Sequence, residues 1–222
     1  MKMKYLALAS FLILLLLSAC EQSSEANTDT HLEAEVKTEL KDTKVQEVLE
    51  EGKRVKQAPT VDRISGRVIQ LLKEKNWDEL SQYVHSERGV CFTPEVYVSK
   101  SDQVFMPVQL KSDQSRREKR NWGEQYGRED KGQMNLEEYY DRYVMDVDFT
   151  QADSVFYDKE KQWGNSINNA RKAFESPYIV EYYIAGVNPA FGGMDWRALR
   201  LVFSPDGEGW GLVGIVHAAW SP

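Results

Sequence analysis

The chain has 222 residues, with 28 Lys and Arg against 35 Asp and Glu, so its formal net charge at pH 7 is −7. This acidic balance argues against nucleic acid and anionic lipid surfaces as binding partners. Two cysteines cannot build a disulfide framework, so the fold has to rest on its hydrophobic core. With only three histidines and no Cys-x-x-Cys or His-Glu-x-x-His motif, the sequence gives no reason to expect a metal or another cofactor.

The first twenty residues have the features of a bacterial export signal. Lys2 and Lys4 precede an apolar run over residues 5–17, which is too short for a membrane-spanning helix of about 20 residues. The run ends in Leu-Ser-Ala followed by Cys20, and this pattern resembles the lipobox of bacterial lipoproteins. The resemblance implies removal of residues 1–19, acylation of Cys20 with fatty acids such as palmitate, and a lipid anchor on the extracytoplasmic face of the cell membrane. The alternative is an ordinary secretory signal in which the cysteine has no role.

Residues 20–59 have the composition of a flexible polar tether. After the cysteine, this stretch contains no aromatic residue and many charged or small polar residues. Such a composition buries too little apolar surface to offset the entropy lost on ordering. Leu32, Val36 and Leu40 have a faint helical spacing, which leaves open a stalk helix that packs on a partner. We expect the folded domain to begin at Thr60, because nearly all aromatic residues follow that point.

Helical patterns open this single domain, which we expect to span residues 60–222. Apolar residues recur at helix spacing between Ile64 and Leu72. Asn76 and Glu79 then have the spacing of a helix cap and its reciprocal partner. The sequence therefore predicts a helix followed by a second, shorter one.

Extended patterns follow. Residues 89–98 and 103–110 have strand-like composition, and their prolines, Pro94 and Pro107, predict edge or broken strands rather than central ones. Cys91 lies in the first of these segments and has the character of a small buried hydrophobic residue.

The second half of the domain alternates polar and apolar segments. Residues 111–133 are rich in charge and predict a polar loop or insertion, with Trp122 as a possible anchor. Asn135 and Glu138 repeat the cap pattern and predict a third helix. Three apolar segments predict strands at 178–186, 198–204 and 210–220. Helices followed by strands joined mostly by hairpins indicate an α+β fold with an antiparallel sheet that wraps the helices.

Four segments, 80–92, 146–149, 193–203 and 211–220, resemble a family of bacterial envelope lipoproteins. Members of that family are similar to the nuclear transport factor two-like superfamily, also called the cystatin-like cone. The resemblance covers residues 60–222 and implies a curved sheet and helices that enclose a cone-shaped cavity. That superfamily contains isomerases, dehydratases and many binding modules, so the fold alone does not imply a function.

The C-terminal hairpin contains most of the candidate site residues. Its Pro-Asp-Gly turn at residues 205–207 predicts a three-residue loop with a glycine bulge. In the register that this loop sets, Asp195 lies opposite His217 at one end of an apolar face. A slip of one residue would instead place His217 opposite Trp196.

Asp195 and His217 are the candidate catalytic residues. A carboxylate beside an imidazole orients the ring and favours its charged form, which is the chemistry of a general acid–base pair. The same pair is also an ordinary way to satisfy a half-buried histidine. The candidates for contact with a ligand are His85, Trp196, Arg197 and Trp220, of which His85 follows a helix and is also suited to cap it.

Two classes of function agree with these observations. The first is a tethered binding module for a small molecule, an envelope component or a partner protein. The second is a small cavity enzyme of the isomerase, dehydratase or hydrolase type that uses Asp195 and His217. Binding is favoured over catalysis, because the apolar strand faces offer few ionisable groups for the floor of an active site.

Overall fold

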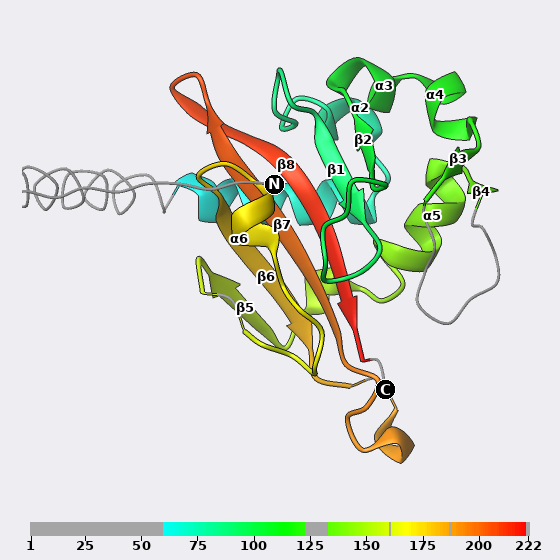
Figure 1. The fold of residues 1–222 in the computed structure, drawn as a ribbon, viewed down its shortest axis with the longest axis vertical. Helices are drawn as coiled ribbons and strands as arrows, with labels where there is room; N and C mark the ends of the chain where they lie inside the picture. Colours follow the sequence, from blue (N-terminus) through cyan, green and yellow to red (C-terminus); the bar gives the residue numbers. More distant parts are fainter. Residues whose placement is uncertain (1–59, 123–132, 160, 187, 221–222) are drawn as a thin grey trace, which may run out of the picture. The chain divides into compact units, whose positions relative to one another are not determined.

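The computed structural model of the protein describes residues 60–122, 133–159, 161–186 and 188–220. The chain divides into two units, Met1–Gly52 and Lys53–Pro222, and all described residues belong to the second (Figure 1). The predicted signal peptide, the predicted tether and part of the predicted insertion therefore lie outside the described residues. Within the described ranges, no helix combines the length and the apolar character needed to cross a membrane.

The domain begins with the two helices that the sequence predicts. A helix runs through residues 60–73, and its inward face is formed by the fully buried Val61, Val68, Leu71 and Leu72. The second helix, α2 (Trp77–Leu80), is capped by Asn76, whose side-chain oxygen accepts from the backbone N–H of Glu79 at 3.2 Å. The predicted Asn76 cap is thus confirmed, but its reciprocal half is not formed: the backbone N–H of Asn76 donates to the Leu71 carbonyl, and the Glu79 carboxylate pairs with Arg67.

Six strands form one curved sheet (Figure 1). They are β1 (Val90–Thr93), β2 (Gln103–Phe105), β5 (Ser154–Tyr157), β6 (Tyr178–Ile184), β7 (Arg197–Asp206) and β8 (Gly209–Ala219). Their order is β2-β1-β8-β7-β6-β5, and every neighbouring pair is antiparallel except β1 and β8, which run parallel. The predicted α+β class is therefore confirmed, and the predicted antiparallel sheet is antiparallel in every neighbouring pair but β1 and β8.

The connections contain further short elements. These are α3 (Pro107–Lys111), α4 (Asp113–Arg117), β3 (Arg120–Asn121), β4 (Gln133–Met134), α5 (Leu136–Tyr143), η1 (Phe149–Gln151), α6 (Ala170–Ala173) and η2 (Pro189–Phe191). The strand predicted over residues 103–110 ends at Phe105, because Pro107 begins α3 at a position where a missing N–H is tolerated. The predicted insertion also contains ordered structure: the Trp122 ring is buried, and its N–H donates to the carbonyl of Met134 at 2.8 Å.

The sheet is covered on both faces. In Figure 1 the helix through residues 60–73 lies behind the sheet and α6 lies in front of it. Side chains from β7 alternate accordingly: Leu199, Leu201 and Phe203 face the core on the helix side, whereas Val202 packs with Ala170 of α6. On the helix side, Trp122 stacks on Tyr139 with ring centroids 3.7 Å apart, and Phe92 and Phe105 pack against Trp122. Large aromatic side chains thus fill the layer between sheet and helices.

Candidate functional site

The C-terminal hairpin has a different register from the one predicted. Asp206 pairs with Gly209, so the turn contains only two residues, and Pro205 and Asp206 remain in β7. A bulge between Val202 and Phe203 shifts the register once more. The predicted three-residue loop is therefore wrong. The physical reason is tertiary: Pro205 and Asp206 both bond to residues of the segment after α2, and these contacts hold them in the strand.

This register separates Asp195 from His217. His217 lies opposite Leu199, and Asp195 belongs to the loop between β6 and β7. There the Asp195 carboxylate accepts from the backbone N–H of Asn188 at 2.7 Å. The predicted acid–base pair of Asp195 and His217 is thus not formed, and Asp195 instead shapes its own loop.

The carboxylate beside His217 is that of Asp146, which follows α5. His217 Nε2 lies 3.3 Å from Asp146 Oδ2, and the same oxygen accepts from Arg197 Nε at 2.7 Å. The other ring nitrogen, Nδ1, lies 3.3 Å from the carbonyl oxygen of Pro94 at the end of β1. The ring of Tyr143 contacts the imidazole edge-on. Both nitrogens of the buried ring are therefore engaged by acceptors of the protein itself.

Asp146 holds this cluster together electrostatically. Burial raises the pKa of its carboxyl, but the hydrogen bonds and charges of His217 and Arg197 outweigh burial and bring the pKa below its ordinary value. No local sequence pattern marks Asp146 as the partner of His217. Only the packing of α5 on the sheet brings the two together.

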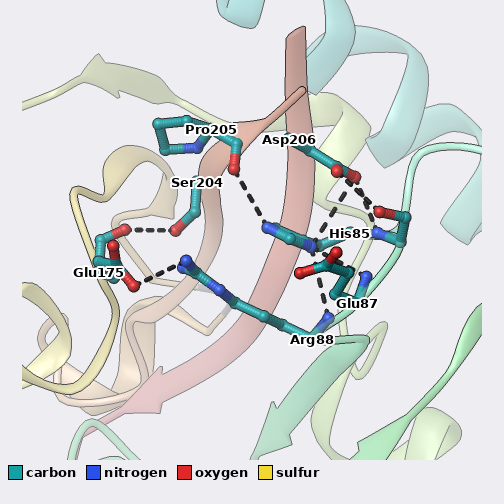
Figure 2. A network of polar contacts seen from close by, with 8 residues as sticks. His85, Glu87, Arg88, Glu175, Ser204, Pro205 and Asp206 are labelled. Carbon is teal, nitrogen blue, oxygen red and sulfur yellow. Dashed lines mark hydrogen bonds and ion pairs between the residues drawn. The ribbon is translucent and has the colours of Figure 1, made fainter. Parts of the chain in front are cut away.

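His85 belongs to a second polar network, at the other end of β7 and β8 (Figure 2). Its Nδ1 accepts from the backbone N–H groups of Glu87 at 3.2 Å and Arg88 at 3.4 Å, so Nε2 carries the hydrogen and donates to the Pro205 carbonyl at 3.1 Å. The sequence predicts that His85 caps the preceding helix through its charge. The structure corrects this: the ring is an acceptor for the turn that follows and ties that turn to β7.

Ser86, His85 and Asp206 have the composition of a catalytic triad without its geometry. Ser86 donates to Asp206 from both its hydroxyl and its backbone N–H, each at 2.8 Å, while His85 Nδ1 is 3.8 Å from Asp206 Oδ2. These hydrogen bonds, led by that of the backbone, lower the pKa of Asp206. The serine proton thus has a carboxylate rather than an imidazole as its acceptor, which is not the arrangement of a Ser-His-Asp triad.

The same network continues to the other face of the hairpin. Arg88 pairs with the Glu175 carboxylate at 2.7 Å, and the hydroxyl of Ser204 donates to the Glu175 carbonyl at 2.7 Å (Figure 2). These contacts join the turn after α2, the hairpin and the segment before β6. The network is a structural link between three parts of the domain.

The remaining ligand candidates lie at the end of the sheet where β6 and β7 are connected. Trp196 is buried beside Ala198 and Ala218, whereas Trp220 is 41% exposed and its backbone N–H donates to the Trp196 carbonyl. Two further apolar side chains of the same loop are exposed: Phe191 by 52% and Met194 by 54%. We refer to Phe191, Met194 and Trp220 as the apolar end of the domain.

A buried ion pair on the face covered by α6 was missed by the sequence analysis. Glu181 of β6 and Arg200 of β7 pair at 2.5 Å, and Trp163 donates from its ring N–H to Glu181 at 2.7 Å. The alternation of β7 was a usable signal, because it places Arg200 on the same face as Ala198 and Val202. That Glu181 is the partner of Arg200 depends on the register in which β6 pairs with β7, and the sequence alone does not reveal this register.

Two hollows on the described surface lie away from the candidate residues. They are lined by polar side chains such as Lys119, Arg142, Lys75 and Arg116, and by none of the candidate residues. Among the described residues, no group of three or more His, Cys, Asp or Glu side chains is placed to hold a metal ion.

Comparisons with known proteins add no likeness: no protein family matches the chain, and neither a curated protein nor a solved structure does. The geometry of the described residues is therefore the basis for a functional proposal.

Proposed function

We propose that the protein is a lipoprotein of the extracytoplasmic membrane face, anchored through acylated Cys20, and that its domain is a binding module for a partner protein. In this proposal residues 20–59 are the tether, and the domain is a variant of the cone-shaped nuclear transport factor two-like fold. The export signal and the lipobox pattern support the anchor. The apolar end supports the binding role.

The observation that carries the proposal is the exposure of Phe191, Met194 and Trp220 at one end of the sheet. Large exposed apolar side chains that lie together are typical of interaction sites, and aromatic residues and methionine are enriched in the cores of protein interfaces. The backbone N–H of Trp220 donates to the carbonyl of Trp196, which follows Met194 by two residues. The backbone N–H of Met194 donates to the carbonyl of Phe191 at 2.9 Å. The three residues therefore lie at the same end of the domain.

The described part of the loop that presents this surface, residues 188–196, has internal hydrogen bonds. Asn188 caps η2 by accepting from the N–H of Ala190 at 2.9 Å, and Asp195 accepts from the N–H of Asn188. Gly192 ends η2 with φ of 56°, in the left-handed region that favours glycine. A loop that is ordered before binding loses less entropy when it meets a partner, so its apolar side chains are suited to act as anchors.

Site-specific photo-crosslinking in cells tests the proposal. A photoreactive phenylalanine analogue at position 191 or 194 should crosslink one and the same protein. The analogue at Val108, which is 72% exposed on α3, should not crosslink it and serves as the matched control.

The crosslinked partner, once purified, should bind the variant Phe191→Ser at least about tenfold more weakly than the wild type, as expected for an interface anchor. Val108→Ser should bind like the wild type. Equal crosslinking from positions 191 and 108, or equal affinity of the two serine variants, would contradict the proposal.

A further inference from the structure

Glu181 and Arg200 form a buried ion pair on the face of the sheet that α6 covers. The two residues lie directly opposite each other on β6 and β7, and each side chain is only 1% exposed. Buried ion pairs contribute little net stability, because the loss of hydration offsets most of their attraction. Their position therefore calls for a role other than stability.

Residues 161–169, which we refer to as the strap, cover this pair. The strap contains no helix or strand, and α6 begins directly after it. Trp163 donates from its ring N–H to Glu181 Oε1 at 2.7 Å and stacks flat on Tyr183, with ring centroids 3.8 Å apart. Arg200 Nη2 donates to the carbonyl of Lys161 at 3.4 Å. The strap thus offers one donor to the carboxylate and one acceptor to the guanidinium.

The guanidinium of Arg200 is not fully satisfied by these partners. Its Nε and Nη2 have acceptors, but Nη1 is buried with no hydrogen-bond partner among the described residues. A guanidinium presents its N–H groups as a fork that fits both oxygens of a carboxylate. The Nη1 group of Arg200 can therefore donate to one more acceptor than the strap and Glu181 supply.

The surroundings of the pair suit a small ligand. Ala198 and Ala218 lie beside Arg200 on the same sheet face, and their short side chains take up little space above the sheet. Tyr183 and Trp196 flank Trp163, with ring centroids 3.8 Å and 6.1 Å from that of Trp163. Displacement of Trp163 would uncover a recess with one carboxylate, one guanidinium and apolar sides.

We propose that Glu181 and Arg200 form a binding site for a free α-amino acid, which the strap occupies in the absence of ligand. The ligand's carboxylate would take the place of the Lys161 carbonyl and also reach Nη1 of Arg200. Its ammonium group would replace the ring N–H of Trp163 at Glu181. A zwitterion suits this site because the pair is neutral as a whole, whereas a simple anion or cation would leave one buried charge uncompensated.

Calorimetric titration of the purified full-length protein with L-alanine tests this proposal. Removal of the strap's ring in Trp163→Ala should tighten alanine binding at least tenfold relative to the wild type, because the internal competitor is lost. Trp163→Phe keeps a ring but lacks the N–H donor, and it should also bind more tightly than the wild type. Trp220→Ala, which removes a tryptophan of the apolar end, is the matched control and should bind like the wild type.

Two analogues separate the halves of the site. N-acetylalanine lacks the ammonium group and alaninamide lacks the carboxylate, so neither should bind to Trp163→Ala with comparable affinity. The proposal is overturned if both Trp163 variants fail to bind alanine, if either analogue binds as well as alanine, or if Trp220→Ala gains the same affinity. The site uses none of the apolar end, so these outcomes do not depend on the partner-protein proposal.

Discussion

Strand β8 passes so close to the turn after α2 that Gly211 has no room for a side chain. A Cβ at Gly211 would lie 2.5 Å from Cα and 2.8 Å from Cβ of His85, and 3.0 Å from a carboxylate oxygen of Asp206. The nearest atom belongs to the backbone, so a side-chain rotation cannot relieve the contact. We therefore expect Gly211→Ala to push the turn away from the hairpin.

The size of this effect follows from the contacts that move. Overpacking a closely packed site destabilises a protein by about 1–3 kcal/mol. Displacement of His85 also lengthens its hydrogen bond to the Pro205 carbonyl, now 3.1 Å, which adds about 1 kcal/mol. The free energy of unfolding should thus fall by about 2–4 kcal/mol. For a domain of this size, that corresponds to a decrease in Tm of about 6–12 °C.

Urea and thermal denaturation, followed by circular dichroism, measure this change. Gly209→Ala is the matched control in the same strand, because a Cβ there would meet nothing closer than the Asp206 carbonyl oxygen at 3.7 Å. Its free energy of unfolding should stay within about 0.5 kcal/mol of the wild-type value. If Gly211→Ala were no less stable than Gly209→Ala, the close packing of the turn on β8 would be refuted.

Further predictions concern the acid range, the thiol and the anchor. Because the pKa of Asp146 is lowered in the folded state, its contribution to stability is complete above about pH 5 and is lost as the pH falls through the folded-state pKa. Asp146→Asn should therefore flatten the fall in the free energy of unfolding between about pH 5 and pH 3, and an unchanged slope would exclude this role. Burial raises the pKa of the Cys91 thiol to about 11, so iodoacetamide at pH 8 should label it at least about 100-fold more slowly in the folded than in the urea-unfolded protein. Similar rates in the two states would show that the thiol is accessible. Cys20→Ala should release the protein from membranes on cell fractionation, and a variant that stays membrane-bound would argue against the lipid anchor.

Structural elements that are set by residues close together in the chain can be predicted from the sequence alone. The cap of α5 is an example: Asn135 accepts from the N–H of Glu138 at 2.9 Å, and the Glu138 carboxylate accepts from the N–H of Asn135 at 2.9 Å. The apolar runs likewise indicate β6, β7 and β8, because a short continuous apolar run is typical of a strand that is buried on both faces. The α+β class then follows from the order of the elements.

Partners that are distant in the chain are decided by the tertiary structure. Contacts with His85 and Ser86, 120 residues earlier, hold Pro205 and Asp206 in β7 and so move the turn. The moved turn, together with the bulge between Val202 and Phe203, changes the residue opposite His217 from Asp195 to Leu199. This shift is an even number of residues, so the face of His217 is predicted correctly while its neighbour is not.

Two charged clusters among the described residues show the same limit. Asp146 reaches His217 only because α5 packs on the helix side of the sheet, and Glu181 meets Arg200 only because β6 pairs with β7 in one register. A sequence pattern states which residues are apolar, charged or turn-forming. It does not state which charge lies within 3 Å of another, because that distance depends on how separate segments pack.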